Sequence, residues 1–390
     1  MDREANERAR EALPGLVSSP LRGVVVVRAW LAAALALSLL GGIAGGLTRA
    51  GIVLPGTGTS DDFIHAAVGH AALMICGFLG TVIGIERAVA NEQRIAFLAP
   101  LSSGSGGVLV LFGQTIVGAW LMVAAALVFV VVNCLLVRRQ FAPHTLLLTV
   151  GALSWFTGNV LFAVTKNSVA PLSWWFAFLV LTIGAERLEM TRLMPRRAGA
   201  PTLLGLALSM LLAGATLLDV APVTSGLLYG AGLSLLALWL SVFDIARRTV
   251  KAHGLSRYMA LCLLSGYAWL FVAGLAWGAT ALGWPARDVA LHAMGLGFIF
   301  SMVMGHAPLI LPSVARVKLH FGVYFYIPLL VLQLSLVLRL VGGSFDASLR
   351  AAGAALNAIS IAIFAITIAG AAVAASVKRA AVARVGKVAS

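Results

Sequence analysis

Twelve long apolar runs constrain the fold of this 390-residue chain more than any other feature. A helix that crosses the hydrocarbon core of a bilayer needs about 20 mostly apolar residues, and only helices and closed barrels satisfy their backbone hydrogen bonds there. The runs cover residues 25–49, 62–85, 94–115, 117–137, 143–165, 171–189, 199–219, 222–243, 257–282, 287–312, 321–342 and 349–377. We therefore predict an all-α, polytopic membrane protein with twelve transmembrane helices.

The composition agrees with a protein whose main partner is the lipid bilayer. Apolar residues make up 61% of the chain and charged residues 11%, whereas soluble domains carry about a quarter charged residues. This excludes a soluble enzyme, a disordered chain and a secreted disulfide scaffold. The net charge of +14 does not indicate nucleic-acid binding, because membrane proteins concentrate Lys and Arg in cytoplasmic loops.

The distribution of cations predicts the orientation. With the N-terminus inside, 23 Lys and Arg residues fall in inner segments and five in outer segments. Because cytoplasmic loops carry the excess of Lys and Arg, we expect both termini in the cytoplasm and the protein in the inner (cytoplasmic) membrane. The chain then divides into a cytoplasmic tail (1–24), a single transmembrane domain (25–377) and a basic cytoplasmic tail (378–390).

A short motif recurs at the predicted inner ends of the second and sixth runs. The string Ile83-Gly84-Ile85-Glu86-Arg87 is matched by Ile183-Gly184-Ala185-Glu186-Arg187, and Gly305-His306 lies at a comparable depth in the tenth run. A spacing of four runs favours three four-helix repeats, at about 25–137, 143–243 and 257–377. The alternative is a coincidence between two helix ends.

Ionisable residues inside membrane helices are costly, so each is a candidate functional residue. Those at the inner ends, together with one histidine at the start of the fifth run, are candidates for ion pairs or proton transfer: Glu86, Arg87, Glu186, Arg187 and His144. The simplest role for the arginines is an interfacial ion pair or a side chain that extends to the membrane surface.

Histidines in the second and tenth runs predict a cofactor site. His65 and His292 lie at nearly the same depth near the outer ends of two helices that run in the same direction, and His70 lies about 7.5 Å deeper than His65. His65 and His70 point about 140° apart, so only one of them can face a given partner. Two imidazoles at matched depth suit the iron of a haem. The alternative is hydrogen bonding between helices.

Further residues complete the candidate set around these histidines. Met74 and Met294 offer thioether ligands to haem iron or copper. Arg49 and Arg287, at the outer ends of the first and tenth runs, are placed to bind haem propionates. The candidate metal ligands are His65, His70, His292 and His306.

The residues His65-Ala66-Ala67-Val68-Gly69-His70 followed by Met74 and Gly77-Phe78, with His292-Ala293 and Gly305-His306, resemble the NnrS family. NnrS proteins are twelve-helix membrane proteins that contain haem and copper and are linked to nitric oxide stress. The topology is also similar to subunit I of the haem–copper oxidases, in which helices 2 and 10 supply both axial ligands of the low-spin haem. The resemblance implies haem b, with copper as a second candidate, and nitric oxide or a redox protein as partner.

The sequence departs from the oxidases at their copper centre. The seventh and eighth runs contain no histidine, and no His-Pro-Glu string occurs. Oxygen reduction at a copper centre is therefore not expected. Two other functions stay open, namely a repeat-built secondary transporter that uses Glu86, Glu186 and His306, and an assembly factor without a cofactor.

Overall fold

The computed structural model describes residues 19–53, 63–91, 93–167, 169–191, 198–314 and 317–388. These residues form helices and connecting turns, and the described part of the chain contains no strand. The long helices and helical runs are α2 (Ser19–Arg49), α3–α4–η2–α5 (Ile64–Asn91), η3–α6 (Arg94–Leu111), α7 (Thr115–Arg139), α8 (Pro143–Thr165), α9 (Leu172–Met190), α10 (Ala200–Thr216), α11 (Pro222–Phe243), α13 (Gly254–Ala281), α14–η5–α15 (Arg287–Val314), η6–α16 (Val323–Leu340) and α17 (Ala347–Val388). Each one overlaps an apolar run of the sequence.

Ten of these helices are long and apolar enough to cross a membrane. The chain is therefore an all-helical, multi-pass membrane protein. The two others are α9, which contains Glu186, Arg187 and Glu189, and α10, which has 17 residues. A count of twelve spans stays a prediction.

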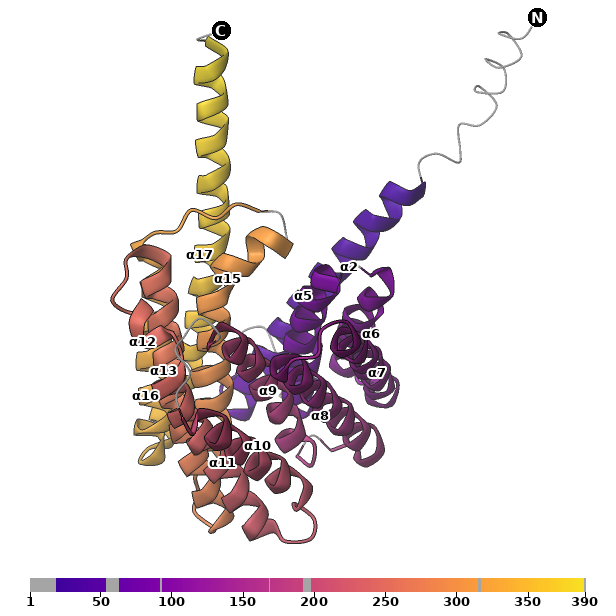
Figure 1. Cartoon of the computed structure of the whole chain (residues 1–390), viewed down its shortest axis with the longest axis vertical. Helices are drawn as coiled ribbons and strands as arrows, with labels where there is room; N and C mark the ends of the chain where they lie inside the picture. Colours follow the sequence, from indigo (N-terminus) through magenta and orange to yellow (C-terminus); the bar gives the residue numbers. More distant parts are fainter. Residues whose placement is uncertain are drawn as a thin grey trace, which may run out of the picture.

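The beginning of α2 and the end of α17 leave the bundle on the same side. The first turns of α2 and the last turns of α17 project from the same end of the molecule (Figure 1). This is the arrangement that an even number of membrane crossings requires. The basic segment expected as a tail after residue 377 continues α17 as helix to Val388.

Helix α9 lies at the centre of the bundle. Most of its residues are buried, and it contacts both η2 and η5. Trp155 of α8 stacks on Phe178 of α9 with ring centroids 4.8 Å apart. Burial on all sides explains why this helix is almost entirely apolar up to Ala185, before the charged residues at its end.

Two π-helical segments of eight residues each interrupt the second and tenth runs: η2 (Leu73–Gly80) and η5 (Ala293–Phe300). Glycines permit close packing there, because a Cβ at Gly297 would lie 2.5 Å from Trp269 of α13. Segments of π-helix are rare and are frequent at functional sites. In a three-unit repeat, α9 would correspond to the second and tenth runs, but it is regular α-helix and contains no such segment. The three-unit repeat therefore also stays a prediction.

Candidate functional site

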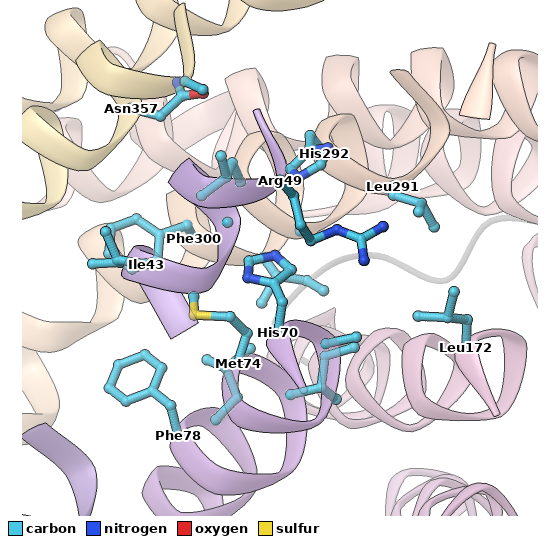
Figure 2. Close-up of a pocket in the computed structure, with 18 of the residues that line it drawn as sticks. Ile43, Arg49, His70, Met74, Phe78, Leu172, Leu291, His292, Phe300 and Asn357 are labelled. Carbon is cyan, nitrogen blue, oxygen red and sulfur yellow. The ribbon is translucent and has the colours of Figure 1, made fainter. Parts of the chain in front are cut away.

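A large cavity lies between α2, the α4–η2 run, α9, the α14–η5 run, α16 and α17. The centre of a water molecule can occupy about 200 Å³ of it, and the total empty space is about 1290 Å³ when the open solvent at its mouth is included. The wall is largely apolar, and its main polar side chains are His70, His292, Arg49, Arg287, Arg339 and Asn357 (Figure 2). A concave, mostly apolar space with a few convergent polar groups is typical of a ligand site.

His70 and His292 face each other in this cavity. Their ring centroids are 6.4 Å apart, and the ring planes are inclined by 33°. His70 begins α4, directly before η2, and His292 ends α14, directly before η5. The two π-helical segments therefore start next to the two histidines that the fold brings together.

His70 is held in place by α2. Its Nδ1 lies 2.7 Å from the carbonyl oxygen of Gly42. Because a carbonyl can only accept a hydrogen bond, Nδ1 carries the proton and donates, and Nε2 keeps its free lone pair. A Cβ at Gly46 would lie 2.8 Å from Cε1 of this ring, so α2 can approach the imidazole only because residue 46 is glycine.

His292 is oriented by a carboxylate and an arginine. Its Nδ1 lies 2.9 Å from Oδ1 of Asp288, one turn earlier in α14. Arg339 of α16 donates to both oxygens of Asp288, at 3.2 and 3.0 Å. The Nη2 atom of Arg339 also lies 3.0 Å from Nε2 of His292. A metal ion at Nε2 requires Arg339 to give up that last contact, whereas Asp288 keeps its hydrogen bond.

Two more arginines, Arg49 and Arg287, add positive charge to the wall. Arg49 donates to the carbonyl oxygen of Ala67 at 3.4 Å. Within the described ranges, neither Arg49 nor Arg287 forms an ion pair with a carboxylate. Arg339, by contrast, is neutralised by Asp288. The cavity therefore suits a flat apolar body that carries acidic groups.

These residues include groups of the kind that bind haem. His70 keeps a free Nε2 lone pair, whereas Nε2 of His292 is in contact with Arg339. The two imidazoles, the mostly apolar space and the two arginines without an ion pair among the described residues could hold the iron, the ring and the two propionates of haem b. No group of three or more His, Cys, Asp or Glu side chains that could hold a metal ion occurs among the residues that the structure describes. Copper stays a prediction from the resemblance alone.

The comparison with protein families identifies the chain. The family described as "Domain of unknown function (DUF8744)" matches residues 28–373. The chain belongs to the DUF8744 family. The range that matches DUF8744 includes every residue named above as lining the cavity. No curated protein and no solved structure matches the chain.

Of the other predicted ligands beside these histidines, Met74 lines the cavity, and His65 and Met294 do not. Met74 lines the cavity of this DUF8744 protein beside His70 (Figure 2). His65 is exposed and lies against Gly113 instead of lining the cavity. Met294 is fully buried and is not part of the wall. The structure therefore places His70, and not His65, opposite His292.

The residues predicted as ion pairs or proton groups meet at the end of the bundle where α5 and α9 end. Nη2 of Arg87 lies 2.7 Å from Oε1 of Glu186, so the two copies of the recurring motif contact each other. Nε2 of His144 lies 3.9 Å from Glu189. His306 belongs to this group and not to the cavity.

Several residues of the site were not identified from the sequence. Asp288, Arg339 and Asn357 line or support the cavity, and Asp244 pairs with Arg187 at the other end of the bundle. The pair of Asp288 and Arg339 could have been found from depth in the membrane, because both residues lie at the predicted outer ends of apolar runs. A carboxylate and a guanidinium at equal depth favour each other as partners.

Proposed function

We propose that this protein binds haem b in the cavity, with His70 and His292 as the two axial ligands. The observation that carries the proposal is the 6.4 Å between the two imidazole centroids. A metal–nitrogen bond of about 2.0–2.1 Å and a ring radius of about 1.1 Å put two imidazoles on opposite sides of one ion at about 6.3 Å. At a tetrahedral angle the same bonds give about 5.2 Å. The geometry therefore supports opposite, axial ligation.

The arginines support the same ligand. Arg49 and Arg287 have no carboxylate partner among the described side chains, so two acidic groups of a ligand can pair with them. A planar guanidinium binds a carboxylate through two parallel hydrogen bonds. Apolar neighbours such as Met74, Phe176 and Leu291 exclude water from the body of the ligand.

We infer that the site serves electron transfer. When bound, haem would supply a one-electron iron couple, and His70 and His292 together would fill both axial positions. Gly42 and Asp288 hold the two imidazoles in orientation through their Nδ1 atoms. Handling or sensing of nitric oxide would need space for the gas beside the bound group. Arg339, whose Nη2 lies 3.0 Å from Nε2 of His292, would compete with a metal ion for that nitrogen.

The proposal includes the topology predicted from the sequence. Twelve spans with both termini in the cytoplasm put the cavity near the outer face of the inner membrane, because α2 ends and α14 begins there. The cation distribution supports this orientation. An outer redox partner, or nitric oxide, would then approach from that face.

Haem titration into purified apoprotein tests the proposal. We expect saturable one-to-one binding by the parent protein, and losses of at least tenfold in affinity for His70→Ala and for His292→Ala. His65→Ala is the matched control, because His65 is exposed and lies outside the cavity. Equal affinity in all four proteins would exclude axial ligation by this pair.

A secondary transporter is the second candidate. Pro308 and Pro312 lie inside α15, and both η2 and η5 interrupt regular helix, as in transporters with broken helices. This function predicts no bound haem and proton-coupled uptake of an anionic solute into proteoliposomes. Absence of both activities would favour an assembly factor without a cofactor.

A further inference from the structure

A second polar site lies at the opposite end of the helices that hold the cavity. We call it the charge cluster, and it comprises Glu86 and Arg87 of α5, Glu186 and Arg187 of α9, Asp244 after α11, Tyr267 of α13 and His306 of α15. Arg87 and Glu186 form an ion pair at 2.7 Å. Nε of Arg187 lies 3.7 Å from Oδ2 of Asp244. The first pair is in direct contact and the second is not.

Three atoms around the second pair are buried without a hydrogen-bond partner among the described residues. They are Nε of Arg187, Oδ2 of Asp244 and the hydroxyl of Tyr267. The side chain of Asp244 has no exposed surface, and Tyr267 is 1% exposed. Buried polar groups are almost always hydrogen-bonded, and ordered water supplies the partner where protein does not. These atoms converge, because Tyr267 faces both Asp244 and Arg187.

We propose that the charge cluster is a hydrated proton-binding site, in which water bridges Arg187, Asp244 and Tyr267 and a proton is exchanged with the inner solvent. The ligand is a proton delivered through water. It binds to a carboxylate oxygen of Asp244 or to Nε2 of His306, and no other bond forms or breaks. This inference does not depend on the haem proposal.

The charges of the cluster explain why it should bind a proton. Three carboxylates, Glu86, Glu186 and Asp244, face two arginines, Arg87 and Arg187. Among the described residues of the cluster, the carboxylates therefore outnumber the arginines by one. His306 faces Glu186, Arg187 and Asp244, and its Nδ1 donates to the carbonyl oxygen of Met302 at 2.8 Å. Its Nε2 is therefore the nitrogen that can accept a proton.

The surroundings of Asp244 support its role as a proton-binding group. Burial raises the pKa of this carboxyl above its ordinary value, whereas Arg187, the backbone N–H of Ala246 and Tyr267 oppose the rise. The shift extends the pH range in which the carboxyl holds a proton. One oxygen of Asp244 accepts the Ala246 N–H at 2.7 Å, and the other faces Arg187.

Infrared difference spectroscopy of the full chain in lipid nanodiscs tests this inference. Spectra recorded between two pH values contain a band for each buried carboxylic acid that titrates. We expect one such band to disappear in Asp244→Asn. In Tyr267→Phe its midpoint should move up by about 0.5–1 pH unit, because the variant loses a donor that favours the carboxylate.

Tyr258→Phe is the matched control. Tyr258 lies on the same helix and is equally buried, and its hydroxyl also has no hydrogen-bond partner among the described residues. It packs against Phe325 and Tyr326 and is not among the groups that shift the pKa of Asp244. Its variant should keep the parent midpoint. The inference is overturned if the spectra contain neither a carboxylic band that depends on Asp244 nor an imidazole band that depends on His306. It is also overturned if the two tyrosine variants titrate alike. Failure of haem binding would leave these results unchanged.

Discussion

Asp288 and Arg339 form a bidentate ion pair beside His292, with Nε–Oδ2 and Nη2–Oδ1 distances of 3.2 and 3.0 Å. The pair joins α14 to α16, which are far apart in the sequence. Since Asp288 also lies 2.9 Å from Nδ1 of His292, the arginine fixes the carboxylate and the carboxylate fixes the imidazole. A histidine held this way by a carboxylate is typical of metal ligands.

Replacement of Asp288 by Asn should weaken cofactor binding. The amide cannot give His292 the basicity that the carboxylate gives, and loss of such a partner costs about 10–100-fold in metal affinity. Asp346→Asn is the control, because Asp346 is exposed and only caps the N–H of Ser348. Haem titration measures both. Equal affinities would show that Asp288 does not act through His292.

Replacement of Arg339 by Met should lower the free energy of unfolding. The variant leaves Asp288, whose side chain is one-third exposed, without its cation. We expect a loss of about 1–3 kcal/mol, less than for a fully buried charge. Thermal unfolding in detergent measures it. Arg350→Met, at an exposed position of α17, should change stability little, and an equal loss there would count against the ion pair.

A methyl group at residue 46 should displace His70. In Gly46→Ala the new Cβ would meet the imidazole at 2.8 Å, so the ring or α2 must move. We expect cofactor affinity to fall about tenfold or more while the protein stays folded. Gly205→Ala has open space around its Cβ and should bind like the parent. Unchanged affinity in Gly46→Ala would mean that the Gly42–His70 contact does not set ring position.

Replacement of Arg87 by Met should destabilise the charge cluster. It leaves Glu186 without its partner at 2.7 Å and beside Glu86. Partly buried ion pairs of this kind suggest a loss of about 1–3 kcal/mol, and the double variant Arg87→Met with Glu186→Gln should recover part of it. Arg94→Met, at an exposed position, is the control. The ion pair does not stabilise the protein if the double variant is less stable than Arg87→Met alone.

The sequence predicted the positions of the helices because each needs about 20 apolar residues, and that requirement is visible in one dimension. Residues such as Arg49, Arg287 and Met74 were likewise expected at the site and line the cavity. Depth along a helix follows from residue counting at 1.5 Å per residue. These properties do not require knowledge of how the helices pack.

The sequence could not predict which side of the second helical run (Ile64–Asn91) points toward the cavity. A break at Gly69 separates α3 from α4, and η2 then changes the number of residues per turn. Residue counting gives the angle between His65 and His70 but not which of the two faces His292, because tertiary packing sets the rotation of the whole helical run. The pairing of Asp288 with Arg339 was hidden for another reason, because only tertiary packing brings α14 beside α16.

The electron paramagnetic resonance spectrum of the oxidised protein, purified from cells supplied with haem, tests the central claim most directly. Two imidazoles on one iron give a low-spin, six-coordinate signal, and we predict that signal in the parent protein and in His65→Ala. His70→Ala and His292→Ala should convert it to a high-spin signal or lose the haem. A colourless parent protein, or a low-spin signal that survives both replacements, would contradict axial ligation by His70 and His292.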